Sequence, residues 1–382
     1  MTTANSPLTI STRPRGALAW FNPAWLPVLA TLLVIGAMLA IGGSAYTGFL
    51  SSKALADLLN GNAYLGICAI GATVVILSGG IDLSIGSVIA CTSILMATLS
   101  YPSVAQQLAI DPSLDPAQLV HGGGMHPAYA ALISIIVGTL FGLTMGAMIA
   151  AYELPPFMVT LAGMFLARAM GHVILNASLG DELEVGSIEI KHLFFAETLP
   201  ELRWHVADTL NRRNRVVPVY IQPTAILMLA SFVVAMVVLH LTSFGRNIYA
   251  IGGDETSAKL MGIRVSRTKM FAYAVSGLCA SIAGVVSSID RLAGNPSDFV
   301  GVELEAIAAV VIGGTLLTGG RGLVIGTFLG SIVLGLIQAF VPFSTWKWLD
   351  AQTTPILIGS LMLLFILMQG GFNALGRWLG RT

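Results

Sequence analysis

Long apolar runs that carry almost no charge organise this chain. About ten such runs can be counted, near the length that spans the roughly 30 Å hydrocarbon core of a bilayer. Only 10% of the 382 residues are charged, whereas soluble domains carry about 25%. Lipid must therefore cover much of the surface, and the sequence predicts an all-α, polytopic membrane protein with some broken or re-entrant helices. The runs lie near 26–44, 59–78, 83–99, 128–150, 157–176, 222–242, 269–289, 303–318, 322–341 and 354–370.

Basic residues outside these runs predict which side of the membrane each loop faces, because cytoplasmic loops are enriched in Lys and Arg. They gather in the N-terminal tail, in a polar island at 243–269 and in the C-terminal tail. An even number of spans between these segments places all three in the cytoplasm. The expected organisation is a cytoplasmic tail (1–24), a transmembrane domain (25–372) and a second cytoplasmic tail (373–382).

Within the transmembrane domain we expect a cytoplasmic loop at 243–268 and periplasmic loops at 101–127 and 178–220. The last of these conflicts with the charge rule, because it contains the basic residues Lys191, Arg203, Arg212, Arg213 and Arg215. Long loops follow the rule less strictly, and the even number of spans remains the expectation.

A Gly-rich pattern occurs twice in the chain. Leu77–Ser87 aligns with Leu317–Thr327, with Leu, Gly, Gly, Leu, Ile and Gly recurring in register. Transporters often contain repeated halves, with discontinuous helices at matching positions near the substrate path. Chance similarity between two Gly-rich segments is the alternative explanation.

Glycines at four-residue spacing form a second pattern, since small residues at this spacing let helix backbones approach closely in lipid. Helix packing within one subunit and a dimer interface are the two interpretations. The glycines are Gly138, Gly142 and Gly146, and again Gly322, Gly326 and Gly330.

Two acidic residues and one amide are weak candidates for a substrate path: Asp82, Glu303 and Asn62. A carboxylate at membrane depth costs ~2.5–3.5 kcal/mol on insertion scales, so it tends to face a cavity or a partner. Structural roles are the alternatives. Asp82 can cap the helix that starts near Leu83, and Glu303 can lie at a helix N-terminus, where the macrodipole favours a carboxylate. Arg168 and His172 either reach toward an interface or face a cavity, and the sequence does not distinguish these positions.

The polar island has the pattern of a short capped helix. The pair Gly252 and Gly253 is expected to break the chain, and Asp254 to cap a helix over Glu255–Met261. Gly262 is expected to end this helix.

A helix of two turns is marginal by itself, so we expect a partner surface to hold this one. Ala258 and Met261 lie three residues apart and are expected to present a small apolar face to that partner. An ordinary membrane loop with one helical turn is the alternative.

Motifs for catalysis are missing from the sequence. The segment Thr318–Gly322 lacks the Lys and the strand context of a phosphate-binding loop. The histidines are scattered, and neither HExxH nor GxSxG occurs. The zero net charge gives no reason to expect nucleic acid as a partner. We therefore expect no enzyme activity and no metal site in this chain.

The motifs together resemble a known family. The island sequence GRNIYAIGGDETSAKLMGI, residues 245–263, resembles the coupling-loop signature of permease subunits from bacterial ABC importers of the ribose, xylose and galactofuranose type. Residues 78–87, 273–284 and 303–322 are similar to further motifs of that family, so the resemblance covers about 55–370. The two long outer loops depart from the family pattern by their length.

The resemblance implies a transmembrane permease subunit of a sugar importer in the bacterial inner (plasma) membrane, which forms the translocation path. It implies a separate cytoplasmic ATPase that binds ATP and Mg, a second permease subunit in a homodimer or heterodimer, and a periplasmic sugar-binding protein. No cofactor is expected in this chain. The residues implied in coupling to the ATPase are Gly252, Gly253, Asp254, Glu255, Ala258, Leu260, Gly262 and Ile263.

A secondary transporter driven by an ion gradient is the alternative function. It needs buried acidic or histidine groups that exchange protons or bind sodium, and this sequence has few of them.

Overall fold

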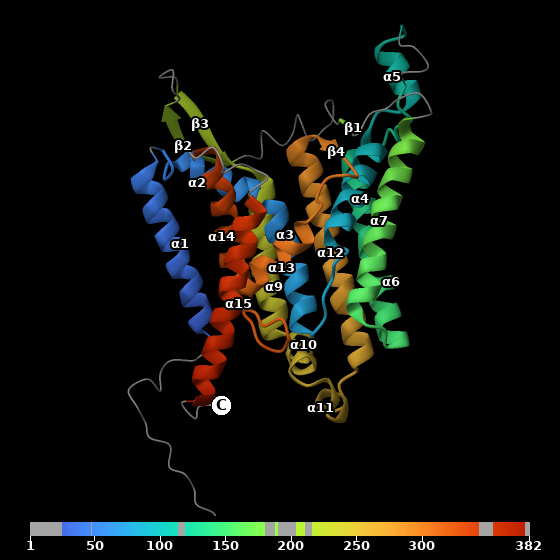
Figure 1. The fold of residues 1–382 in the computed structure, drawn as a ribbon. Coiled ribbons are helices and arrows are strands. Elements are labelled where there is room, and N and C mark those ends of the chain that lie inside the picture. Colours follow the sequence, from blue (N-terminus) through green and yellow to red (C-terminus); the bar gives the residue numbers. More distant parts are fainter. Residues whose placement is uncertain are drawn as a thin grey trace, which may run out of the picture.

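The structure, a computed structural model, is a bundle of helices that run between two ends (Figure 1). It describes residues 25–46, 48–113, 119–179, 188–189, 204–210, 216–343 and 354–378. The helices are α1 (Leu26–Ala45), α2 (Ser52–Gly61), α3 (Ala63–Leu77), α4 (Ile85–Ser100), α5 (Val104–Ile110), α6 (Pro127–Tyr152), α7 (Pro156–Leu179), α9 (Pro223–Leu241), α10 (Ser243–Gly253), α11 (Glu255–Leu260), α12 (Val265–Arg291), α13 (Val302–Ile312), α14 (Val324–Phe343) and α15 (Thr354–Trp378).

Helix α3 is the centre of the bundle. Every residue of α3 except Tyr64 is buried, and α9, α12, α13 and α14 pack around it. The outer helices α1, α6, α7 and α9 instead expose large apolar side chains, among them Leu33, Leu140, Phe165 and Val233. In a membrane protein such side chains face lipid.

Five helices among the described residues are long and apolar enough to cross a membrane, and a sixth span is possible if the bent pair α2 and α3 counts as one. They are α1, α6, α7, α9 and α12. Helices α4, α14 and α15 have shorter apolar stretches, and α13 has only 11 residues. The helical membrane protein predicted from the sequence is confirmed, and each of the ten predicted runs overlaps a helix. Ten full-length spans are not established.

Two helices are shorter than their apolar runs because glycine-rich segments interrupt them. The first break, residues 78–84, separates α3 from α4, so α4 begins at Ile85 and not near residue 83. The second break, residues 313–323, separates α13 from α14. Helix α13 therefore ends at Ile312 rather than near residue 318, where Gly313 and then Gly314, with φ +90°, end it.

The glycines at four-residue spacing serve packing within this chain. Gly142 on α6 lies against Gly277 on α12, where an added Cβ atom would come within 2.9 Å of the Gly277 Cα atom. On α14, Gly326 and Gly330 lie against the main chain of Gly313 and Ala309. Both series let neighbouring helices of one subunit approach closely.

Short strands at one end add to the helical bundle. Strands β2 (Trp204–Leu210) and β3 (Val216–Ile221) form an antiparallel hairpin, and β1 (Ile188–Glu189) pairs with β4 (Ala293–Gly294). The Asn60 side chain on α2 fixes the hairpin, donating to the Tyr220 carbonyl at 3.1 Å and accepting from the Gln222 N–H at 2.9 Å.

The two ends of the bundle carry different connections. Figure 1 shows β2, β3 and α5 at one end, the hairpin end, and α10 and α11 at the other, the coupling end. The start of α1 lies at the coupling end as well, because Pro27 packs on Gly314 of the second break. The described parts of the two predicted outer loops, α5 and the β2–β3 hairpin, thus lie opposite the polar island.

Candidate functional site

Helix α10 runs through both glycines that were predicted to break it. Thr242 caps its start by accepting a hydrogen bond from the Gly245 N–H at 3.4 Å, and the helix ends at Gly253. The predicted break therefore falls directly after the pair, at Asp254. Gly252 is also required by packing, since an added Cβ atom would collide with the carbonyl oxygen of Leu77 and the nitrogen of Gly320.

Helix α11 has the caps that its sequence predicts. The Asp254 carboxylate accepts a hydrogen bond from the Ser257 N–H at 2.7 Å, and this bond holds the pKa of Asp254 below its usual range. Met261 is the C-cap, so the helix is one residue shorter than predicted, and Gly262 follows with a φ of +80°. A left-handed conformation there favours glycine.

Of the two residues predicted to form an exposed apolar face on α11, Ala258 is buried and Met261 is exposed. Ala258 is fully buried, packed with Ile251 of α10 and Val265 of α12 in a small core of the coupling end. This core packs α11 against helices of its own chain. The exposed apolar residues are Leu260 and Met261, at 84% and 69% of their accessible area.

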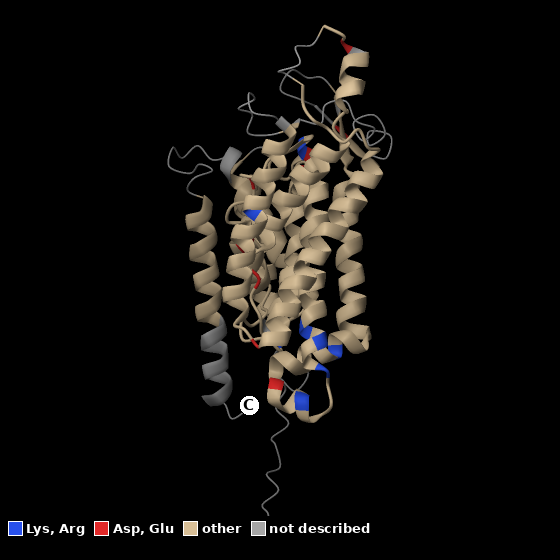
Figure 2. Ribbon diagram, turned by 90° about the vertical axis from the view of Figure 1, so that its right-hand side faces the viewer, with Lys and Arg blue, Asp and Glu red and all other residues tan. Residues whose placement is uncertain are grey.

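Ion pairs connect α11 to its neighbours. Glu255 accepts from the Lys269 ammonium of α12 at 2.6 Å, and Lys259 lies 3.2 Å from the same carboxylate. The hydrogen bond from Lys269 lowers the pKa of Glu255. Lys259 also lies 3.9 Å from Glu153 at the end of α6. Figure 2 shows basic residues gathered at this end of the bundle.

Asp82 in the first break is fully satisfied by its own chain. It is buried, and one carboxylate oxygen accepts from the Ser84 N–H at 2.9 Å and the Ser84 hydroxyl at 2.6 Å. The other accepts from the Ser276 hydroxyl of α12 at 2.7 Å. The N-cap of α4 is Ser84 rather than Asp82. The carboxylate therefore joins the first break to α12.

Asn62 lies at the bend between α2 and α3, where it lines a cavity of about 400 Å³ bordered by α1, α2 and α14. Its amide nitrogen donates to the Ser331 carbonyl of α14 at 2.7 Å. Its amide oxygen is buried and has no partner among the described residues. This unpaired acceptor is suited to a ligand hydroxyl.

Glu303 lies in the first turn of α13, as its sequence position predicts. One carboxylate oxygen accepts from the Gly301 N–H at 3.2 Å. The other is buried, lies against Gly86 of α4, and has no partner in the described part of the chain. No hydrogen bond between described residues joins Asn62, Asp82 and Glu303 to one another.

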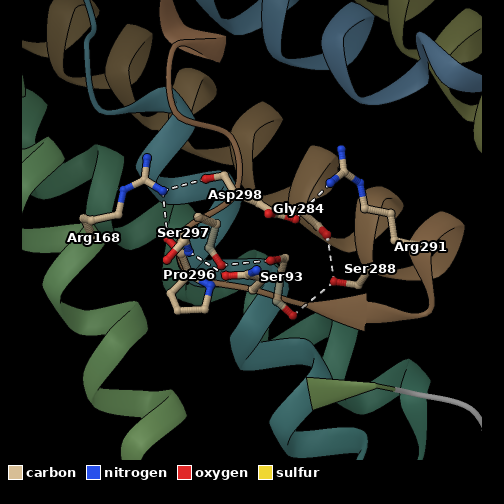
Figure 3. A network of polar contacts seen from close by, with 10 residues as sticks. Ser93, Arg168, Gly284, Ser288, Arg291, Pro296, Ser297 and Asp298 are labelled. Carbon is tan, nitrogen blue, oxygen red and sulfur yellow. Dashed lines mark hydrogen bonds and ion pairs between the residues drawn. The ribbon is translucent and has the colours of Figure 1, made fainter. Parts of the chain in front are cut away.

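Two arginines fix the segment that leads into α13 (Figure 3). Arg168 of α7 donates to the carbonyl oxygens of Pro296 at 2.7 Å and Asp298 at 2.6 Å. Arg291, at the end of α12, pairs with the Asp298 carboxylate at 2.9 Å and lies 4.8 Å from the Phe299 ring centroid. Arg168 therefore faces into the protein, whereas His172 is exposed. The ion pair between Arg291 and Asp298 was not predicted from the sequence. The sequence signal for it is that the two residues lie on either side of the turn sequence at 295–297.

A helical bundle with two glycine breaks and a compact basic loop at one end has the architecture of a membrane permease. The chain belongs to the family described as branched-chain amino acid transport system / permease component, which matches residues 54–367. The family resemblance inferred from the motifs is confirmed by this match and by the curated relatives.

The relatives are permease proteins of bacteria. The chain is 38% identical over 352 residues to the inner membrane ABC transporter permease protein YjfF of Escherichia coli K12, covering 92% of this chain and 93% of the relative. It is 34% identical to the fructose import permease protein FruG of Bifidobacterium longum, covering 65% and 69%. It is 30% identical to the ribose import permease protein RbsC of Escherichia coli K12, covering 84% and 87%. No solved structure matches the chain.

Proposed function

We propose that this protein is the permease subunit of an ATP-driven sugar importer in the bacterial inner membrane. Two relatives are named for ribose and fructose import, and the family is one of transport permeases. The observation that carries the proposal is the coupling end, where a small, self-supported core holds two exposed apolar residues, Leu260 and Met261.

In this proposal a separate ATPase subunit docks on α11. Leu260 and Met261 enter an apolar groove of that subunit, and the exposed basic residues Lys259, Arg264 and Arg267 surround the contact. Apolar anchors with a charged rim are the usual anatomy of such an interface. ATP and Mg bind to the partner chain, and this chain supplies no cofactor site.

The proposed orientation places the coupling end in the cytoplasm, with ten spans and both termini on that side. The common location of α10, α11 and the start of α1 supports it. The hairpin end then faces the periplasm, where a sugar-binding protein delivers substrate. A second permease subunit, identical or different, completes the path.

We assign Asn62 and Glu303 to the substrate path, because each keeps a buried acceptor oxygen unpaired within the described chain. A sugar hydroxyl can donate to either oxygen. Asp82 has a structural role in this assignment, since its oxygens already accept three hydrogen bonds. Sugar uptake by Asn62→Ala and by Glu303→Gln tests the assignment of these two residues. If both variants keep the wild-type KM and rate, neither residue belongs to the substrate path.

The docking assignment is tested by placing a charge on the exposed face of α11. Leu260→Glu should abolish co-purification with the ATP-binding subunit of the same gene cluster, while the permease still inserts in the membrane. Leu108→Glu is the matched control, because Leu108 is a partly exposed leucine of α5 at the hairpin end. Equal recovery of the ATPase with both variants would show that α11 is not the docking site.

A further inference from the structure

Main-chain atoms of the coupling end touch both glycine breaks. We name this contact the glycine junction and define it by Gly79 of the first break, Gly252 of α10, and Gly319 and Gly320 of the second break. The two copies of the sequence repeat, which are far apart in the chain, meet there. The Gly320 N–H donates to the carbonyl oxygen of Leu77 at 3.0 Å.

The two glycines of the second break leave no room for a side chain at the junction. A Cβ atom added at Gly319 would lie 2.8 Å from the nitrogen of Gly79 and 3.1 Å from the Cα of Gly252. One added at Gly320 would lie 2.5 Å from the nitrogen of Gly253. Gly79, Gly319 and Gly320 also have φ values of +81°, +86° and +70°. Packing and backbone conformation thus both favour glycine at Gly319 and Gly320, and backbone conformation favours it at Gly79.

A second contact joins α10 to the second break. The Tyr249 hydroxyl donates to the Gly322 carbonyl at 2.9 Å. Helix α10 therefore holds the second break by a side-chain bond and touches both breaks at Gly252, while its Ile251 packs in the same small core as Ala258 of α11. Contacts between packed atoms thus connect α11 to α10 and α10 to both breaks.

From this geometry we propose that the glycine junction is the element through which the coupling end moves the interrupted helices, with Gly252 as the positioning residue. The proposal rests on the proposed function and extends it, because it names the internal route from α11 to α4 and α14. The two breaks move together, since the Leu77–Gly320 hydrogen bond joins them and Gly252 contacts both.

Two helical glycines provide a matched pair for the test. A Cβ atom at Gly252 would collide with Leu77 at the end of α3 and with Gly320 of the second break, whereas one at Gly36 of α1 meets no atom within 4 Å. In proteoliposomes with the ATPase and binding protein, Gly252→Ala should lower sugar uptake about tenfold, because overpacking displaces the breaks. ATP hydrolysis should continue, so the sugar imported per ATP falls. Gly36→Ala should match the wild type in both.

A purely structural role for Gly252 would lower uptake and hydrolysis together, and that result would overturn the proposal. Identical behaviour of the two alanine variants would overturn it as well. Wild-type uptake that does not depend on ATP would instead contradict the proposed function. The two failures are therefore distinguishable.

Hydrogen exchange on the wild-type complex tests the junction even if Gly252→Ala fails to fold. Addition of a non-hydrolysable ATP analogue should change protection together in peptides covering 248–254, 76–84 and 316–323. Helix α5 at the hairpin end is the internal reference and should not change. A change confined to 248–254, or none in these peptides, would overturn the proposal.

Discussion

The two glycine breaks have similar sequences but are held by different parts of the molecule. The first is fixed to the bundle, where the Ser276 hydroxyl of α12 donates to Asp82 and the Thr160 hydroxyl of α7 donates to the Ile81 carbonyl. At the position aligned with Asp82, the second break has Gly322, whose carbonyl accepts from Tyr249 of α10.

The two breaks therefore differ in what holds them. A buried carboxylate with three hydrogen bonds ties the first break to α12. The second break is held by its own turn, with the Leu316 N–H donating to the Arg321 carbonyl at 3.0 Å, and by the coupling end. The repeat thus gives two interruptions of similar local shape, one bonded to the bundle and one bonded to the coupling end.

Removal of the anchoring carboxylate should have the largest effect. Asp82→Ala leaves the donors of Ser84 and Ser276 unpaired in a buried site, and should destabilise the protein by about 3 kcal/mol or more. Thermal unfolding in detergent measures this loss, and Asp82→Asn should recover part of it. A variant with wild-type stability that nevertheless fails to import sugar would assign Asp82 to the substrate path instead.

A pair of tyrosine variants compares the two breaks directly. Tyr249→Phe removes the bond to the second break and should lower the sugar imported per ATP, with a change in stability of about 1 kcal/mol. Tyr273→Phe removes the longer, 3.4 Å bond to the Ile81 carbonyl in the first break and should leave that ratio unchanged. A reduced ratio in Tyr273→Phe alone would show that coupling depends on the side-chain bond to the first break and not on the bond to the second.

Acid should loosen the coupling end selectively. The pKa of Glu255 is lowered in the folded protein by the hydrogen bond from Lys269, so its stabilisation is present above the unfolded pKa and is lost as the pH falls through the folded value. The pair is partly exposed, and its contribution is below about 1 kcal/mol. Protection of 254–260 should fall below pH of about 4, and Glu255→Gln should weaken this pH dependence. Equal pH dependence in both proteins would contradict the role of the pair.

The smallest effect on transport is expected far from both breaks. Ser103 forms a capping box with Gln106 at the start of α5. Ser103→Ala should weaken this exposed helix by about 0.5 kcal/mol without changing uptake. The rate of proteolysis within α5 measures the loss of helix stability, and sugar uptake by the same preparation measures transport. A transport defect would show that the hairpin end takes part in coupling.

The sequence predicted best those features that depend on local chemistry. Asp254 and Gly262 mark the ends of α11 because capping and left-handed conformation follow from residue type. The role of Gly252 was missed because it depends on distant residues. A glycine pair resembles a helix breaker locally, yet here tertiary contact with Leu77 and Gly320 also requires glycine in the last turn of α10.

Contacts between distant segments account for the remaining differences. Ala258 looked like a docking residue because its helix was considered alone, whereas Ile251 and Val265 bury it. Arg291 and Asp298 are ordinary polar residues in the sequence and acquire a role only when Arg168 of α7 approaches the same segment. The β2–β3 hairpin was missed because the charged loop gave no clear alternation.

The enclosed position of α3 constrains how the chain is made. Its neighbours α9, α12, α13 and α14 all follow it by more than a hundred residues, so the ribosome completes α3 long before the helices that surround it. Until then its surface must be sheltered by lipid or by the insertion machinery. One contact that can form only after α14 is made is the buried 2.8 Å hydrogen bond between the hydroxyls of Thr73 on α3 and Thr327 on α14. Assembly of the centre is therefore among the last events of synthesis, although its sequence is among the first to enter the membrane.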